Sequence, residues 1–398
     1  MAKIRGGFDP DRLVDPVRSA PVVGKIVSSE IETEAKGFTE IKIVGVGGGG
    51  NNALNRMIEA GIRGVDFIAV NTDAQALEKS HAVHKIPIGG KNMKRLGAGG
   101  DPMMGERAAE ISRDQLEETL SGADMVFITA GMGGGTGTGA SPVIAEIAKR
   151  NRSLTVAVVT LPFTFEGRHR RAVAEQGFQL LKERVDAIIA IPNDRLLAMA
   201  GKRMSLVESF KLADNILRQG VQGISDLITV TGLINLDFAD VKSIMNGAGT
   251  ALMAIGEAKG PTRAIQAAQL AIASPLLDVS VDGATGVLIN VTGGPDMSLI
   301  EVSEAAGLIK EAASPEANII VGAVINPRVQ SELQVTLIAT GFGGSEVKKA
   351  PVKVSDVFAK LDNSSPSTPS VQDIPHPRPS VDPQDLDMPA FLRRKRVE

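Results

Sequence analysis

Apolar strands that alternate with helices constrain the fold of this chain more than any other feature. Runs of strand length recur between residues 41 and 191, with helical signals in the segments between them. The strands are expected at residues 41–46, 65–70, 123–130, 154–161 and 187–191. This alternation predicts an α/β fold with a mainly parallel, Rossmann-like sheet, and such sheets bind their ligands at the carboxyl ends of the strands.

Three glycine-rich segments lie at strand ends or helix starts, where a bare backbone lets a phosphate approach amide groups. Gly45 to Gly50 has the spacing G-x-G-x-x-G, which alone fits NAD, FAD or a tight structural turn. Gly131 to Gly139 adds consecutive amides and two hydroxyls, and Gly97 to Gly100 precedes a helix that Asp101 caps. Three such segments favour a triphosphate. The chain has no G-x-x-x-x-G-K-[ST] motif, so it is not an ordinary P-loop enzyme.

A long helix is expected from Ser205 to Thr229, because apolar residues recur every three or four positions behind a capping box of Ser205 and Glu208. At about 1.5 Å per residue this helix is roughly 37 Å long, so its two ends do not serve one small site. Phe210 and Asp214 lie one turn apart near its start, and together they suit a flat polar ring. Alternatively, Phe210 belongs to the core.

A pair of acids follows the far end of this helix, in the segment Asn235-Leu-Asp237-Phe-Ala-Asp240. The length of the helix suggests that this pair and the Phe210 and Asp214 side chains act together across two molecules. Alternatively, Asp237 is an N-cap and Asp240 is a first-turn acid that the helix dipole favours.

The rest of the chain divides into segments of different character. Residues 233–342 have both helix and strand signals and predict a smaller α+β domain, which ends with strands at 319–325 and 333–340 around a turn at Asn326-Pro327. The expected organisation is a flexible arm at residues 1–38, a triphosphate-binding α/β domain at 39–204 and the central helix at 205–232. The α+β domain at 233–342 is followed by a disordered linker at 343–385 and a docking peptide at 386–398.

Composition excludes several classes of function. The 398 residues are 43% hydrophobic, and a net charge of -3 argues against nucleic acid as a main partner. The absence of cysteine removes disulfides, thiol catalysis and cysteine-bound metal. The histidines show no metal-ligand spacing beyond His81-x-x-His84, which is expected in a loop. No apolar run has the length of a signal-peptide core or a membrane span, so a soluble protein without direct membrane insertion is expected.

A family resemblance becomes specific at the second glycine segment. Gly133-Gly-Gly-Thr-Gly-Thr-Gly139 resembles the signature of the tubulin and FtsZ superfamily of GTPases. Asn235 to Asp240 is similar to the acidic loop of its bacterial branch, and the tail from Leu386 to Arg396 is similar to that branch's adaptor-binding peptide. The likeness runs from about Ile41 to Thr340 and resumes at the tail. It implies a Rossmann-like GTPase domain that the central helix joins to the smaller α+β domain.

The resemblance implies a set of contacts to GTP or GDP. Phosphate contacts are expected around the glycine segments, at Gly48, Gly49, Gly50, Asn51, Asn52, Thr72, Asp73, Ala98, Gly99, Gly134, Gly135, Thr136, Gly137 and Thr138. The ribose is expected near Glu166, Arg170 and Asn193, although Glu166 and Arg170 also fit a plain surface ion pair. Phe210 is expected to stack on guanine. Asp214 is expected to accept hydrogen bonds from the N1–H and the exocyclic amine, a pairing that adenine does not offer.

The resemblance also implies an activity. Asn235, Asp237 and Asp240 of one subunit are expected to complete GTP hydrolysis on the next, in a head-to-tail polymer that forms the cytoplasmic division ring. Mg2+ is expected to be held mainly through phosphates and water. The tail residues expected to bind membrane adaptors and division regulators are Met388, Pro389, Phe391, Leu392 and Arg393. The alternatives are a Rossmann-type NAD-binding oxidoreductase and a tubulin-like plasmid-segregation filament.

Overall fold

The structure is a computed structural model that describes residues 39–90, 97–199, 204–230, 234, 236–277, 281–327, 329 and 331–342. The expected arm, linker and docking peptide lie outside the described residues, and so does Asn235. The same holds for the adaptor-binding residues Met388, Pro389, Phe391, Leu392 and Arg393. Among the helices of the described part, none is long and apolar enough to cross a membrane.

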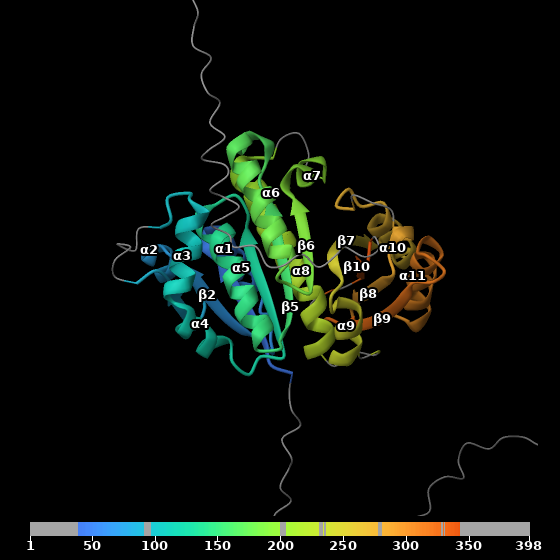
Figure 1. Cartoon of the computed structure of the whole chain (residues 1–398). Helices are drawn as coiled ribbons and strands as arrows, with labels where there is room; N and C mark the ends of the chain where they lie inside the picture. The colour runs from blue at the N-terminus through green and yellow to red at the C-terminus, as the bar shows by residue number, and fades with distance from the viewer. Residues whose placement is uncertain are drawn as a thin grey trace, which may run out of the picture. The chain divides into compact units, whose positions relative to one another are not determined.

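A ten-stranded sheet runs through the described residues, in the order β3-β2-β1-β4-β5-β6-β7-β10-β8-β9. Figure 1 labels β2 and the strands from β5 to β10 of this sheet. Neighbouring strands from β3 to β6 are parallel, as the alternating sequence pattern predicted. The elements of this half are β1 (Ile41–Val46), α1 (Gly47–Glu59), β2 (Asp66–Asn71), α2 (Ala74–Glu78), β3 (His84–Pro87), α3 (Pro102–Ile111), α4 (Arg113–Leu120), β4 (Met125–Gly131), α5 (Gly135–Arg150), β5 (Leu154–Leu161), the 3-10 helix η2 (Thr164–Glu166), α6 (Arg168–Lys182), β6 (Ala187–Pro192) and α7 (Asn193–Met199).

The second half of the sheet is mixed. Its elements are α8 (Leu206–Thr229), α9 (Phe238–Met245), β7 (Gly249–Lys259), α10 (Arg263–Ile272), η3 (Val281–Gly283), β8 (Gly286–Gly293), α11 (Leu299–Ala312), β9 (Asn318–Ile325) and β10 (Glu332–Thr340). The last two strands are not neighbours, so the predicted closure by a pair of strands around Asn326-Pro327 is wrong. The crossover through α11 places β9 parallel to β8, and β10 fills the position between β7 and β8, antiparallel to both.

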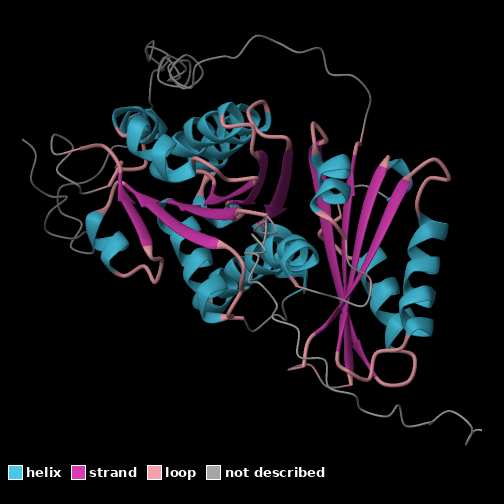
Figure 2. Cartoon of the chain, turned by 90° about the horizontal axis from the view of Figure 1, so that it is seen from below, coloured by secondary structure: helices cyan, strands magenta, loops and turns pink. Residues whose placement is uncertain are grey.

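Buried side chains on both faces of the parallel half explain its continuous apolar strands. In β1, Ile41 and Ile43 enter a core shared with α1 and α8, whereas Val44 and Val46 enter a core shared with α3 to α6. Alternate residues of a strand point to opposite faces, so one strand supplies both cores. Helices therefore cover both faces of this half, as Figure 2 shows.

The central helix α8 forms where the apolar pattern predicted it. Its capping box is complete, since the Ser205 amide donates to Glu208 Oε2 at 2.8 Å and the Glu208 amide donates to Ser205 Oγ at 3.2 Å. The helix packs closely against the second half of the sheet. An added Cβ at Gly223 would lie 2.9 Å from Thr336 Cγ2 of β10. We therefore expect α8 to behave as a rigid rod fixed to both halves of the sheet.

The two halves of the sheet meet at β6 and β7. These strands are parallel and pair at Ala187↔Gly249, Ile188↔Thr250 and Ile189↔Ala251. The sheet therefore continues across the expected boundary between the GTP-binding and α+β domains. The positions of the domain boundaries themselves stay predictions.

Candidate functional site

The glycine segments after β1 and β4 form the first turns of helices. The sequence predicts glycine loops here, with helices only at residues 51–60 and 140–150. α1 instead begins at Gly47 and α5 at Gly135, so the predicted starts at Asn51 and Ala140 are wrong. Glycine is a poor helix former, which misled the prediction, but packing requires it here. An added Cβ at Gly50 would lie 2.3 Å from a carbonyl oxygen of β4. The first amides of both helices lack partners within the helix and are available to an anion.

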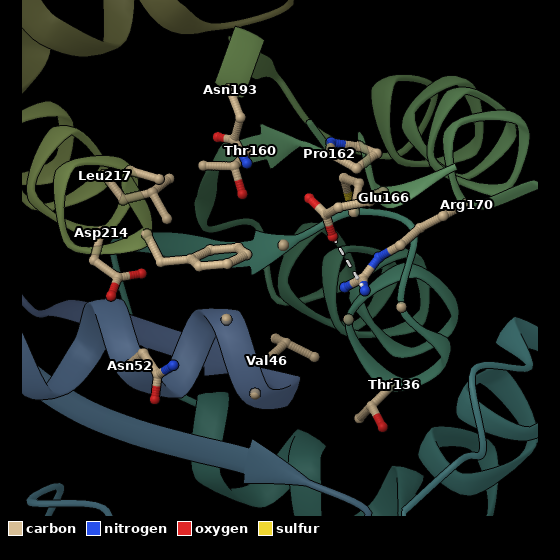
Figure 3. A pocket seen from close by; sticks show the side chains of 18 of the residues that line it. Val46, Asn52, Thr136, Thr160, Pro162, Glu166, Arg170, Asn193, Asp214 and Leu217 are labelled. Carbon is tan, nitrogen blue, oxygen red and sulfur yellow. Dashed lines mark ion pairs between the residues drawn. The ribbon is translucent and has the colours of Figure 1, made fainter. Parts of the chain in front are cut away.

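A cavity of about 410 Å³ lies beside these helix starts and α8 (Figure 3). Gly48 and Gly134 line it, and an added Cβ at either position would meet no atom within 4 Å. Bare backbone therefore borders open space, as a bound phosphate requires. The predicted site residues that line this cavity are Gly48, Gly49, Asn52, Gly134, Gly135, Thr136, Gly137, Glu166, Arg170, Asn193, Phe210 and Asp214.

At one end of the cavity, α8 presents an aromatic ring beside a carboxylate. Phe210 is 41% exposed, so it is not the core residue of the alternative interpretation, and its ring stands edge-on to that of Phe163 with centroids 5.5 Å apart. Asp214 accepts a hydrogen bond from Arg56 Nε at 3.3 Å. Burial raises the pKa of Asp214 to about 6, and the Arg56 guanidinium opposes this rise. This end suits a flat ring that donates hydrogen bonds from one edge.

Glu166, Arg170 and Asn193 line the cavity on the side of α6 and α7 (Figure 3). Arg170 Nη1 lies 3.1 Å from Glu166 Oε2, so these two residues form the ion pair of the alternative interpretation and also border the cavity. Glu166 Oε1 accepts a hydrogen bond from the Phe163 amide at 2.9 Å. Asn193 Oδ1 is buried and accepts no hydrogen bond from the described residues. A buried acceptor without a partner fits a ligand hydroxyl group.

Several predicted site residues do not line this cavity. They are Gly50, Asn51, Thr72, Asp73, Ala98, Gly99 and Thr138. Thr72 Oγ1 lies 2.6 Å from Thr136 Oγ1, which links the end of β2 to the start of α5. The Asp73 carboxylate caps α2. Gly99 lines a neighbouring cavity of about 680 Å³ together with Asp101, and this cavity shares Gly134, Gly135 and Arg170 with the first.

Thr138 holds the turn between β4 and α5, and its replacement by valine is expected to loosen that turn. Its buried hydroxyl oxygen accepts a hydrogen bond from the Gly133 amide at 2.8 Å. Thr138→Val leaves this buried amide without a partner, so we expect a loss of about 1–3 kcal/mol in the free energy of unfolding. GDP affinity should fall in parallel because the turn borders the cavity. Urea unfolding and GDP titration measure both effects. Thr138→Ser, which keeps the hydroxyl, should lose much less, and equal behaviour of the two variants would contradict this role.

Sequence reasoning missed part of the cavity wall. The missed residues are Val46, Gly131, Met132, Thr160, Pro162, Ala213 and Leu217. Most of them had a readable signal, since Val46, Gly131 and Thr160 are at or near the carboxyl ends of parallel strands. Ala213 and Leu217 lie three and seven residues after Phe210, on the same side of α8.

The acid pair lies apart from the cavity. Asp237 and Asp240 form a capping box at the start of α9, with the Asp240 amide donating to Asp237 Oδ1 at 2.9 Å and the Asp237 amide donating to Asp240 Oδ2 at 3.3 Å. This geometry matches the alternative interpretation, in which Asp237 is an N-cap and Asp240 is a first-turn acid. Asp237 is nevertheless exposed, and neither residue lines the cavity. The structure therefore does not bring the acids together with the predicted nucleotide contacts of the same chain.

Three features define a nucleotide-binding α/β protein. They are the parallel sheet, the bare glycine amides at the carboxyl ends of its strands, and the end of the cavity that suits a flat polar ring. Residues 40–201 match the model of the Tubulin/FtsZ family, GTPase domain, and residues 249–343 match that of the FtsZ family, C-terminal domain. The chain belongs to the tubulin/FtsZ family and carries its GTPase domain, whose nucleotide is GTP or GDP. This assignment displaces the alternative of an NAD-binding oxidoreductase.

Solved structures agree with the family assignment. An empty FtsZ dimer from M. jannaschii is 45% identical, with a TM-score of 0.74, and the match covers 79% of this chain and 94% of that chain. A point mutant of FtsZ from M. jannaschii is 46% identical with the same TM-score of 0.74, over 76% of this chain and 91% of that chain. CetZ2 from Haloferax volcanii, described as a GTPgS-bound protofilament, is 20% identical with a TM-score of 0.65, over 81% and 98%, and shows the shared fold.

Proposed function

We propose that this chain is a GTPase that polymerises head to tail and hydrolyses GTP at the junction between two subunits. In this proposal the cavity beside α8 holds the nucleotide, and the next subunit brings its acidic loop, Asn235 to Asp240, to the terminal phosphate. The observation that carries the proposal is the separation between the cavity and the acid pair along α8.

The length and packing of α8 support a division of the site between two subunits. At about 1.5 Å per residue, the stretch from Asp214 to Thr229 spans roughly 22 Å. Asp237 follows only after the end of this helix. Because α8 is packed into both halves of the sheet, it does not bend to carry the acids back to the cavity. A subunit therefore needs a neighbour to complete its reaction centre.

Each part of the cavity has a proposed role in nucleotide binding. The first-turn amides of α1 and α5 donate to phosphate oxygens, while Glu166, Arg170 and Asn193 contact the ribose. Phe210 stacks on guanine, and Asp214 accepts from its N1–H and exocyclic amine. Thr72, Asp73 and Thr138 support the phosphate loops from behind.

Mg2+ would enter with the nucleotide, held mainly by phosphate oxygens and water. The Thr136 hydroxyl and the Asp101 carboxylate border the phosphate end, and oxygen donors of this kind suit a hard cation. The cation supplies charge that offsets the negative charge of the phosphates. The protein's own contribution to hydrolysis is positional. Asp237 and Asp240, with Asn235 beside them, orient and polarise the attacking water.

An interface of this kind joins two different surfaces of the same chain, so its repetition gives an open filament. The M. jannaschii relative is described as a dimer and the Haloferax relative as a protofilament, which supports polymerisation of this chain. We further propose that the filament forms the cytoplasmic ring at the division site. The peptide at residues 386–398, with Met388, Phe391 and Leu392 as anchors, would bind membrane adaptors and division regulators. This peptide favours division over plasmid segregation.

Phosphate release at increasing protein concentration tests the proposal. If two subunits share each reaction centre, the rate per subunit should be near zero in dilute protein and should rise steeply once filaments form. Light scattering on the same samples reports the onset of polymerisation, and both onsets should coincide. A rate per subunit that stays constant from dilute monomers to filaments would contradict the proposal.

A further inference from the structure

A second cavity borders the ring-binding end of the nucleotide cavity. This side groove has a volume of about 460 Å³ and lies between α1 and α8. It shares Asn52, Phe210 and Asp214 with the nucleotide cavity, and Arg56 is among the residues that it adds. Asp214 therefore stands in the wall between the two cavities, with Arg56 on the side away from the nucleotide.

The Asp214 carboxylate is in an unfavourable place for a negative charge. Its side chain is 15% exposed, and burial raises its pKa to about 6. A guanine ring stacked on Phe210 would remove further water from it. A protonated carboxyl group loses its charge and turns one oxygen into a hydrogen-bond donor, so it binds the two donors of the guanine edge poorly.

Among the described residues, Arg56 makes the ion pair that opposes this protonation. Its Nε atom lies 3.3 Å from Asp214 Oδ2, which leaves Oδ1 for a ligand. The other charged residues around Asp214 are Glu59 and Lys211 in the groove, and Glu166 and Arg170 across the nucleotide cavity. Glu166 and Arg170 pair with each other. Arg218, one turn further along α8, bonds to Asn215 and Gln222 instead.

We propose that Arg56 is a positioning residue for guanine recognition, which reaches Asp214 from the side groove, keeps its carboxylate ionised and turns one oxygen toward the base. The inference rests on the proposed nucleotide site. Arg56 does not line the nucleotide cavity, so its effect passes through Asp214. It reaches this position because it follows Asn52 by one turn on α1, on the face that packs against α8.

A pH dependence of nucleotide binding follows from this arrangement. The pKa of Asp214 is about 6, so binding to the unchanged protein should weaken as the pH falls through about 6. Removal of the Arg56 charge lets burial raise the pKa of Asp214 further. The weakening then begins at a higher pH, and it disappears in sufficiently alkaline buffer where Asp214 is ionised without help.

Equilibrium binding of GDP by the full chain between pH 6 and 8.5 tests the proposal without any contribution from hydrolysis. For a rise of one unit in the pKa of Asp214, the loss of GDP affinity between pH 8.5 and pH 6.5 should be about threefold larger in Arg56→Gln than in the unchanged protein. Lys211→Gln is the matched control, because it removes a neighbouring positive charge from the same groove without touching the ion pair. Arg56→Lys should recover most of the pH profile.

Two outcomes would overturn the proposal. One is a pH profile of Arg56→Gln that coincides with that of the unchanged protein. The other is an equal loss of affinity at every pH, which would indicate a structural role, and thermal unfolding at pH 8.5 checks that the variant is folded. Failure of the proposed function looks different, since the unchanged protein would then not bind GDP even at pH 8.5.

Discussion

GTP turnover is expected to fall by about a hundredfold or more when Asp237 and Asp240 are both replaced by asparagine, while GTP affinity changes by less than about twofold. The carboxylates are proposed to act on the water of the neighbouring subunit, and neither lines the nucleotide cavity of its own chain. Asparagine is as good an N-cap as aspartate, so the charge is lost while the capping hydrogen bonds of α9 can persist. Phosphate release and GTP titration measure the two quantities.

A control separates catalysis from helix capping. Ser298→Ala breaks the capping box of α11, which has the same form as that of α9 but lies elsewhere in the second half of the sheet. It should cost about 0.5–2 kcal/mol in the free energy of unfolding and leave turnover per folded filament unchanged. Loss of GTP binding in the double asparagine variant would contradict the assignment, as would normal turnover.

Mixing two inactive variants sharpens this test. Phe210→Ala/Asp214→Ala should abolish GTP binding but keeps its acids, whereas the double asparagine variant binds GTP but lacks them. A junction is complete where the double asparagine variant supplies the bound GTP and the Phe210→Ala/Asp214→Ala variant supplies the acidic loop. The mixture should therefore regain turnover that neither variant has alone. No recovery in mixtures that still form filaments would argue against a shared site.

The largest loss of stability is expected from Gly139→Ala, at about 3 kcal/mol or more in the free energy of unfolding. An added Cβ would lie 1.9 Å from the Pro102 carbonyl oxygen and 2.7 Å from the Glu106 amide nitrogen, and both belong to the backbone of α3. The two helices would have to move apart. Since α3 and α5 both begin at the proposed phosphate end of the site, GDP affinity should fall as well. Urea unfolding and GDP titration report the two losses.

Gly307→Ala in α11 is the matched control for Gly139. It is also a glycine inside a helix, but an added Cβ there would meet nothing within 4 Å. Alanine is the better helix former, so this variant should gain up to about 1 kcal/mol. If both variants lost stability equally, close packing of α3 on α5 would not be the reason for glycine at residue 139.

Capping residues and apolar spacing were sufficient to predict helices and strands whose signals lie within a short stretch of the sequence. The capping box and apolar spacing predicted α8, and an apolar run of strand length predicted β1 with its observed bounds. The order of the last strands was not accessible in this way. The placement of β10 between β7 and β8 depends on pairing between residues far apart in the chain, and the turn at Asn326-Pro327 contains no information about it.

The candidate site likewise has features that local sequence predicts and features that depend on residues far apart in the chain. Glycine spacing predicted backbone that the structure places in the wall of the cavity, but the helical conformation of Gly47 to Gly50 depends on close contact with β4, which the sequence does not display. Short elements such as α2, β3 and α7 were missed because segments of five, four and seven residues carry too little periodicity. The ion pair of Arg56 with Asp214 joins residues 158 positions apart, so only the folded chain reveals it.

The seam between β6 and β7 has a mechanical consequence. Three residue pairs join these strands, whereas β10 is paired with β7 and β8 over nearly its whole length. Resistance to twisting is therefore lowest along this line, and thermal fluctuations of the sheet should concentrate there. Since α8 lies against both sides of the seam, a small rotation about the seam would change the angle at which α9 faces a neighbouring subunit in the proposed filament.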